Sequence, residues 1–188
     1  DSSYSVRLSD YEPETITYLI KGAKIDQLLY TLNEPAYAKG FIDIRGDITG
    51  AKPEKLKGKI VTKIYKGSVN TSVVNEKFAT KLKNALNFSG DIVTDLEPYK
   101  LVSNAKLYTS MANVFVKKAI VNIKDNSINS DYQVLVSDLS KLYDVTNTKM
   151  KGSVKLDGNI LKNQDLKVTG TSDIFKGKLD FELFNNDL

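Results

Sequence analysis

The chain has 188 residues, of which 41% are hydrophobic and 27% are charged, so it is long enough to bury a core. It contains neither cysteine nor histidine. Their absence excludes disulfide bonds, thiol nucleophiles, Cys- or His-ligated metals and every catalytic dyad or triad that needs an imidazole. The longest stretch without a charged residue, residues 107–116, is too short to span a bilayer.

The net charge of +4 is unevenly distributed along the chain. Residues 51–124 carry 14 basic and 5 acidic side chains, whereas the segments on either side are slightly acidic. This middle segment is either attracted to an anionic surface or is simply a solvated, lysine-rich exterior. Of the 27 basic residues 25 are lysine, whereas reading of nucleic acid depends mainly on the arginine fork, so we expect no nucleic-acid partner.

In chain order, the first elements are a turn, a short helix and a strand. Residues 10–13 (Asp-Tyr-Glu-Pro) predict a turn, since Asp can close an Asx turn and Pro cannot continue a ladder. Residues 26–32 are compatible with one short helical turn. In residues 41–48 the even positions are apolar and the odd positions after Phe41 are charged, which predicts a strand with one dry and one solvated face.

The middle of the chain predicts a tight turn, a helix and a second Asp-Pro turn. Lys66 and Gly67 are typical of a tight hairpin with glycine at a positive φ angle. Asn75 can cap a helix that runs to about Leu86, with its apolar residues on one stripe and lysines outside it. Residues 95–98 (Asp-Leu-Glu-Pro) repeat the turn pattern of residues 10–13.

The last third returns to alternation with a period of two. Residues 132–136 alternate loosely, residues 137–143 predict a short helical turn, and residues 153–160 and 178–183 alternate clearly. Lys176-Gly177 predicts another tight hairpin. Because parallel strands would be apolar throughout, this pattern predicts antiparallel strands joined to their neighbours in sequence. The fold class is therefore all-β with short helices that cap a sheet.

The sequence contains an internal repeat. Residues 39–48 align with residues 151–160, and residues 56–67 align with residues 166–177, with nine identities in 22 positions. We therefore expect residues 1–188 to form a single repetitive β domain. The predicted repeat units lie near residues 39–74, 88–136 and 151–185.

Three short patterns that could indicate other functions have simpler explanations. Residues 103–106 (Ser-Asn-Ala-Lys) match the serine–lysine motif of penicillin-interacting enzymes but lie in a strand pattern. Residues 45–47 (Arg-Gly-Asp) form the adhesion tripeptide but lie inside an alternating strand, as solvated surface charge. Asp43 and Asp47 could form a carboxylate pair for glycoside hydrolysis, yet the chain has no Trp for a sugar platform. We therefore expect that the protein is not an enzyme.

The C-terminal third contains an aspartate-leucine turn, a glycine-led alternating strand with a second glycine six residues later, and an aromatic-x-glycine hairpin. These features occur in residues 136–142, 150–160, 166–170 and 175–181. In these features the sequence resembles the bacterial AsmA/TamB-like group of repeating β-groove proteins. Residues 25–74 are also similar, whereas residues 99–130 contain no glycine.

The resemblance implies a repetitive, curled antiparallel sheet that forms an open groove with an apolar lining. It implies that the groove holds phospholipid acyl chains for transport between membranes, without a cofactor. It also implies a periplasmic protein anchored at the inner membrane by a helix outside this chain. Because the sequence starts at Asp1 without Met, we expect it to be an excised segment of a longer envelope protein.

The candidate lipid-binding residues are the apolar positions of the alternating strands. A concave apolar face that side chains do not fill must be filled by something else, and lipid tails are a natural filler. The alternative is that the same face forms a closed core in a structural or adhesive module that binds a polyanion or a protein. The candidates are Ile42, Ile44, Ile48, Ile60, Ile64, Val154, Leu156, Ile160, Leu179, Phe181 and Leu183.

Overall fold

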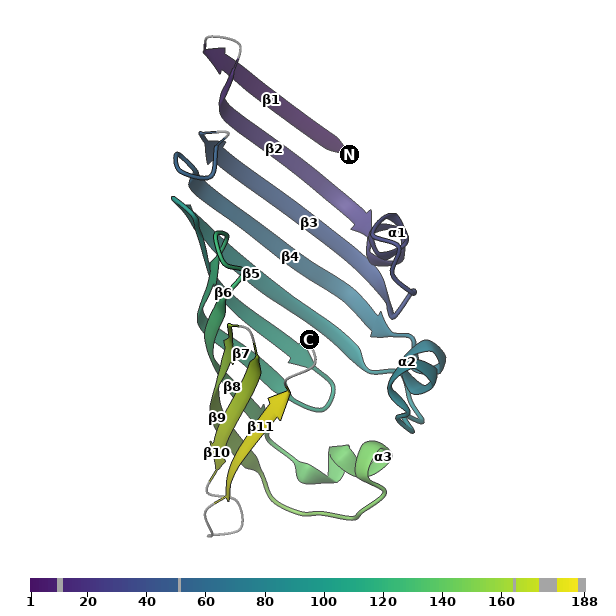
Figure 1. Cartoon of the computed structure of the whole chain (residues 1–188). Coiled ribbons are helices and arrows are strands. Elements are labelled where there is room, and N and C mark those ends of the chain that lie inside the picture. Colours follow the sequence, from purple (N-terminus) through teal and green to yellow (C-terminus); the bar gives the residue numbers. More distant parts are fainter. Residues whose placement is uncertain (10–11, 51, 164, 173–178, 186–188) are drawn as a thin grey trace.

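The computed structural model describes residues 1–9, 12–50, 52–163, 165–172 and 179–185. These residues form one 11-stranded sheet in which each strand pairs with the strands before and after it in sequence (Figure 1). Neighbouring strands are antiparallel throughout, as the alternation of apolar and polar residues predicted. The all-β fold with short helices is therefore confirmed.

The longest strands lie in the first half of the sheet. The first six are β1 (Ser2–Ser9), β2 (Glu12–Lys24), β3 (Ala38–Thr49), β4 (Lys57–Val69), β5 (Asn87–Glu97) and β6 (Lys100–Thr109). The remaining five are β7 (Asn113–Asn122), β8 (Ile128–Val136), β9 (Val154–Lys162), β10 (Leu166–Ser172) and β11 (Leu179–Asn185). The strands predicted from residues 41–48, 132–136, 153–160 and 178–183 correspond to β3, β8, β9 and β11, with ends shifted by up to four residues.

The described helices all lie at the same margin of the sheet (Figure 1). α1 (Ile25–Thr31) follows β2, α2 (Thr71–Phe78) follows β4, and η1 (Leu139–Leu142) with α3 (Tyr143–Thr146) follows β8. The connections that follow β3, β5 and β7 lie at the opposite margin. The helical turns expected at residues 26–32 and 137–143 are thus present.

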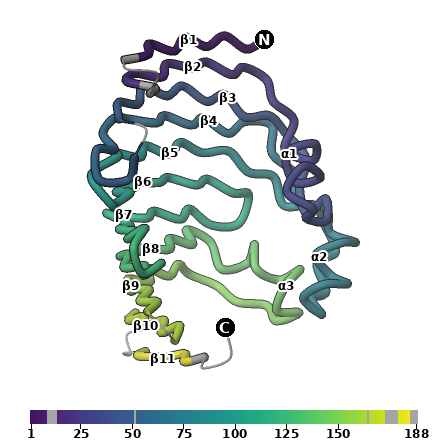
Figure 2. The backbone as a smooth tube through the Cα atoms, turned by 45° about the horizontal axis from the view of Figure 1, so that its top comes forward, coloured from purple at the N-terminus to yellow at the C-terminus, as the bar shows by residue number. Residues whose placement is uncertain are grey.

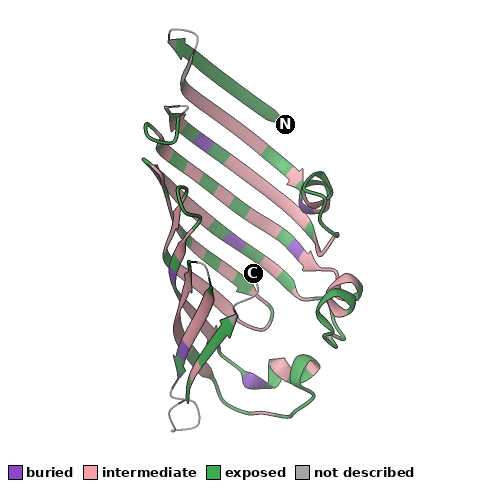
Figure 3. Cartoon of the chain, in the orientation of Figure 1, coloured by how far each residue is buried: buried purple, intermediate pink, exposed green. Residues whose placement is uncertain are grey.

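The sheet is curled and open. Figure 2 shows the strands descending from β1 to β7, after which β8 to β11 turn away from the plane of the first strands. β1 and β11 are the two edges, and they do not pair with each other. Among the described residues only four apolar side chains are buried, namely Ile25, Leu96, Val136 and Leu139 (Figure 3). The described residues therefore do not form the closed core that we considered as the alternative.

The hairpin expected at Lys66-Gly67 is not formed. β4 continues through both residues to Val69, and the pairing with β5 shifts between Ile64 and Gly67. Lys66 has a φ of 51°, so the left-handed residue makes a β-bulge rather than a turn. The equivalent expectation at Lys176-Gly177 lies outside the described residues.

The helix expected from Asn75 to Leu86 is also wrong in its bounds. α2 begins at Thr71 and ends at Phe78, where Ala79 takes a left-handed φ of 51°. Asn75 lies within α2 and is not its cap. Its side-chain oxygen accepts a hydrogen bond from the N–H of Leu82 at 2.8 Å, which holds the next segment in a non-helical loop.

Of the two expected Asp-Pro turns, the one at residues 95–98 lies fully within the described residues. β5 extends through Asp95 to Glu97, and Pro98 and Tyr99 form the turn to β6, with Tyr99 at a φ of 60°. A turn is therefore present, but it lies at Pro98 and Tyr99, and Asp95, which was expected to close it, is part of β5. Residues 10 and 11 lie outside the described residues.

Candidate functional site: the apolar inner face

The candidate lipid-binding residues all lie on one face of the sheet. Residues that pair directly in an antiparallel ladder have side chains on the same face, so a face can be followed from strand to strand. One such line of partners crosses every strand. It runs through Ser2, Ile20, Ile44, Thr62, Ile92, Ala105, Val116, Tyr132, Gly158, Gly170 and Phe181.

The other candidates join this line because side chains two residues apart on a strand share a face. Ile42 pairs with Ile64, and Ile48 lies on the same face two residues beyond Gly46. At the other end of the sheet, Val168 connects Ile160 to Leu183. The structure therefore places every predicted site residue on one surface, which we call the apolar face.

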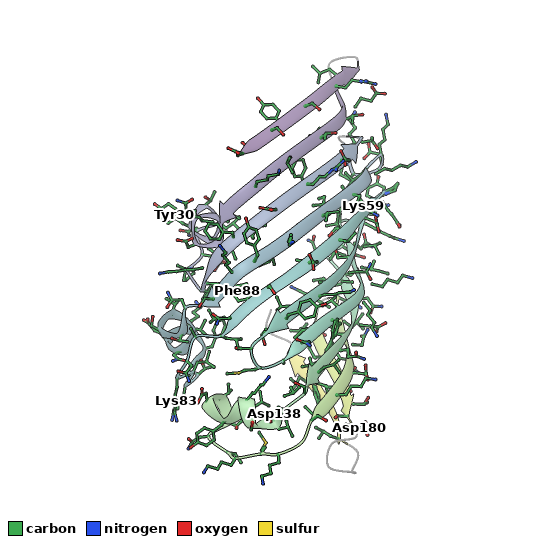
Figure 4. The ribbon with its side chains drawn as sticks, turned by 180° about the vertical axis from the view of Figure 1, so that it is seen from behind. Tyr30, Lys59, Lys83, Phe88, Asp138 and Asp180 are labelled. Carbon is green, nitrogen blue, oxygen red and sulfur yellow. The ribbon has the colours of Figure 1, made fainter. Side chains whose placement is uncertain are left out.

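The apolar face lies inside the curl. The N–H of Thr109 donates to the carbonyl of Ala112 at 2.9 Å, so Thr109 turns its main-chain groups toward β7. Consider a strand that runs upward, seen from the side toward which one of its side chains points. Because the residue has the L configuration, its N–H and C=O then point to the viewer's right. In Figure 1 β7 lies on that side of β6, so the face of Thr109 and Ala105 is the one toward the viewer. β10 and β11 curl toward the same side, since they lie behind the other strands in Figure 4.

The side chains of the apolar face are only partly covered. Most of the candidates are half-buried, while Leu179 is 45% and Leu183 62% exposed. On the edge strand β1, Val6 and Leu8 belong to the same face and are 46% and 60% exposed. The inner surface is therefore apolar but not packed against another layer of described residues.

Tyrosines cover glycines on this face. Tyr18 of β2 pairs with Gly46 of β3, and Tyr132 of β8 pairs with Gly158 of β9. The Tyr132 hydroxyl crosses β9 and donates to the carbonyl of Thr169 on β10 at 3.0 Å. Burial raises the pKa of both phenols above the ordinary value of 10.0. Each tyrosine thus fills the space that the missing side chain of a glycine leaves open.

The two best-aligned copies of the sequence repeat have the same strand register. Pairs of residues between β3 and β4 coincide, after the offsets of the alignment, with pairs between β9 and β10. The tyrosine that covers the central glycine is also equivalent in the two copies. The equivalent pairs are Ile44–Thr62 and Leu156–Ser172, Gly46–Ile60 and Gly158–Gly170, and Ile48–Gly58 and Ile160–Val168.

The outer face carries charges of alternating sign. Lys63 of β4 pairs with Asp43 of β3 on one side and with Asp91 of β5 on the other, and Asp91 pairs with Lys106. Ion pairs between described residues lie on this face. They join Arg45 to Asp47 at 3.4 Å, Lys59 to Asp95 at 3.4 Å, Lys155 to Asp157 at 2.9 Å and Lys167 to Glu182 at 3.0 Å. Acidic partners therefore offset much of the basic charge of the middle strands.

The structure also shows where the short sequence patterns that could indicate other functions lie. Ser103 is on the apolar face, with its hydroxyl 2.9 Å from that of Thr94, while Lys106 is on the outer face. The two side chains therefore point away from each other and cannot act as a nucleophile and its base. Arg45 and Asp47 pair with each other in the middle of β3. The described residues contain no group of three or more acidic side chains that could hold a metal ion.

Sequence reasoning missed the contribution of the middle strands to the apolar face. In β6 and β7 the face is formed by residues such as Leu101, Leu107, Val114 and Val116, with the smaller Ala105 between them. Apolar residues alternate there with a period of two, but these strands contain no glycine and several of the side chains are small. The alternation is therefore too weak to predict the face from the sequence. Strand register is the information that joins these residues to the predicted ones.

No protein-family model matches this sequence, and neither a curated protein nor a solved structure matches it. In the part of the chain that the structure describes, every helix is too short or too polar to cross a membrane.

Proposed function

We propose that this chain is a non-enzymatic lipid-binding segment that holds phospholipid acyl chains against its apolar face. The observation that supports the proposal is the extent of that face, which crosses all 11 strands while its side chains remain partly exposed. Exposed apolar area of this size is unfavourable in water and is typical of a surface that another molecule covers.

Acyl chains suit this surface better than a compact ligand does. Each buried methylene contributes about 0.8 kcal/mol, and no directional polar contact is needed. One acyl chain extends about 15 Å, half of a hydrocarbon core of about 30 Å. Strands about 4.8 Å apart make the sheet several times broader than that, so the groove can hold more than one chain.

The resemblance to the AsmA/TamB-like group supplies the biological setting of the proposal. In that setting the chain is part of a bacterial envelope protein in the periplasm, and its groove carries phospholipid between the two membranes. The membrane anchor would lie outside this chain. No residue of the apolar face is proposed to hold a cofactor.

The test compares neighbouring residues on opposite faces of one strand. Ile60→Asp places a charge on the apolar face of β4, whereas Val61→Asp places it on the outer face, where Val61 is 41% exposed and pairs with Arg45. Ile160→Asp and Leu161→Asp form the same pair on β9. Each purified variant is extracted with organic solvent, and its phospholipid is quantified by mass spectrometry.

We expect the two apolar-face variants to remain folded and to lose most of their lipid, because a charge among acyl chains is costly. The outer-face variants should keep the lipid content of the unmodified protein. Equal lipid content in all four variants, or an unmodified protein without lipid, would contradict the proposal. Unfolding of only the apolar-face variants would indicate a packed core instead of a groove.

A further inference from the structure

The positive charge that the outer face does not offset is concentrated at the helix-bearing margin. Two connections there, residues 70–86 and 137–153, together carry six lysines and three acidic residues. We call them the lysine rim. The third helical connection, residues 25–37, has two acidic residues and no basic one, so it is excluded from the lysine rim.

The two parts of the lysine rim lie against each other. The Lys83 ammonium is 5.3 Å from the centre of the Tyr143 ring, and the Asn84 amide donates to the carboxylate of Asp144. In Figures 1 and 2, α2 and α3 accordingly lie at the same margin. Figure 4 shows Lys83 at the edge of the molecule, away from the sheet. Segments separated by 60 residues thus form one surface.

The lysines of the rim are available to an external anion. All of them are exposed, and among the described residues none has a carboxylate within ion-pairing distance. Two of the three acidic residues are engaged locally, since Asp138 accepts from the N–H of Ser140 at 2.9 Å and Asp144 accepts from Asn84. The lysines are Lys77, Lys81, Lys83, Lys141, Lys149 and Lys151.

Apolar and aromatic side chains are interleaved with these lysines. Phe78 is 61% exposed beside Lys77, Val145 is 45% exposed, and Tyr143 is 38% exposed. Lysine ammonium groups attract anionic headgroups, while aromatic and aliphatic side chains enter the interfacial region of a bilayer. A folded anion-binding pocket would instead need converging, partly buried donors, and the rim lysines are spread over an exposed surface.

We propose that the lysine rim docks on the surface of a bilayer that contains anionic phospholipid. Docking there would bring the helix-bearing end of the strands, and with it one end of the apolar face, next to the membrane. This inference does not depend on the groove holding lipid, because it rests on the charge and exposure of the rim.

The experiment measures sedimentation of the unmodified chain with vesicles of phosphatidylglycerol and phosphatidylcholine, and with vesicles of phosphatidylcholine alone. The test variant is the triple substitution Lys77→Glu, Lys81→Glu and Lys83→Glu. The control is Lys55→Glu, Lys118→Glu and Lys124→Glu, which changes the net charge equally at exposed positions outside the rim. Melting temperatures establish that both variants are folded.

We expect binding only to the anionic vesicles, and a loss of affinity of about 100-fold in the rim variant, since each lysine near such a surface contributes about 1 kcal/mol. The control variant should bind much more tightly than the rim variant. Phe78→Ser should weaken binding, whereas Phe184→Ser on the outer face of β11, which is similarly exposed at 59%, should not. Equal losses in both charge variants, or equal binding to both kinds of vesicle, would overturn the inference.

Failure of this inference can be distinguished from failure of the proposed function. Ile60→Asp should lose extracted lipid and still bind anionic vesicles. The rim variant should lose vesicle binding and keep its extracted lipid. A rim variant that binds vesicles as well as the unmodified chain would refute the docking surface and leave the groove proposal unaffected.

Discussion

The two tyrosine-covered glycines should respond differently to the addition of one methyl group. A Cβ at Gly46 would lie 2.3 Å from two ring atoms of Tyr18, and its three nearest atoms all belong to that side chain. A Cβ at Gly158 would lie 2.2 Å from the main-chain oxygen of Thr169 and 2.4 Å from Cζ of Tyr132. Real Cβ contacts are not this short, so the neighbours must move. A ring can rotate away, whereas the main chain of β10, which is paired on both sides, cannot.

The magnitudes follow from what must be displaced. Overpacking costs about 1–3 kcal/mol, and Ala in a strand recovers about 0.5–1 kcal/mol of chain entropy relative to Gly. For Gly46→Ala we therefore expect a loss of about 1 kcal/mol. Gly158→Ala also breaks the hydrogen bond from Tyr132 to Thr169, worth about 1 kcal/mol, so we expect a loss of about 2–3 kcal/mol.

Denaturant unfolding of single and double variants tests this reasoning. In the background of Tyr18→Ala, Gly46→Ala should become neutral or stabilising, because the ring that it displaces is absent. In the background of Tyr132→Ala, Gly158→Ala should remain costly, because the main-chain oxygen of Thr169 still blocks the methyl group. Additive costs at Gly46, or full rescue at Gly158, would refute the argument.

Three further outcomes depend on titration and on metal. Burial raises the pKa of Tyr18 and Tyr132. The stability that their neutral phenols contribute is therefore present below about pH 10 and is lost as the pH rises through the raised pKa values. The melting temperature of Tyr132→Phe should fall less steeply in this alkaline range than that of the unmodified protein. Hydrogen bonds from Gln133 and Lys155 lower the pKa of Asp157. The stability that the ionised carboxylate contributes is therefore present above the ordinary pKa of 3.8 and is lost as the pH falls through the lowered pKa. Asp157→Asn should reduce the acid sensitivity of the melting temperature. Because the described residues contain no cluster of metal-ligating side chains, EDTA should leave the melting temperature unchanged, and a shift of several degrees would reveal a missed metal site.

The apolar face could be predicted where period-two alternation is strong. Ile42, Ile44 and Ile48 alternate with charged residues, and so does Leu156, and the structure places all four on one face. Alternation specifies a face because a strand turns successive side chains to opposite sides. It does not specify which strands are neighbours, so it could not distinguish an open sheet from a closed core.

The local predictions were wrong where the same residue pattern is compatible with two different structures. The pair Lys66-Gly67 has the left-handed backbone expected of a tight turn, but a bulge within a continuous strand uses the same conformation. Asn75 was expected to cap a helix because its side chain accepts hydrogen bonds from main-chain N–H groups. It does accept one, from Leu82, but this contact closes the loop after the helix. Only the tertiary arrangement selects between these outcomes.

The openness of the sheet follows from how its residues divide their roles. The charged side chains of the outer face pair with one another and are solvated by water. On the inner face, glycines such as Gly46 and Gly158 let tyrosines lie flat across the sheet. Neither device supplies a second apolar layer, and few apolar side chains among the described residues are buried. A molecule that covers the inner face would bind the folded sheet and not the unfolded chain, so its binding and the stability of the sheet would be thermodynamically linked. On this argument an occupant of the apolar face supplies the layer that a closed β-protein obtains from its own second sheet.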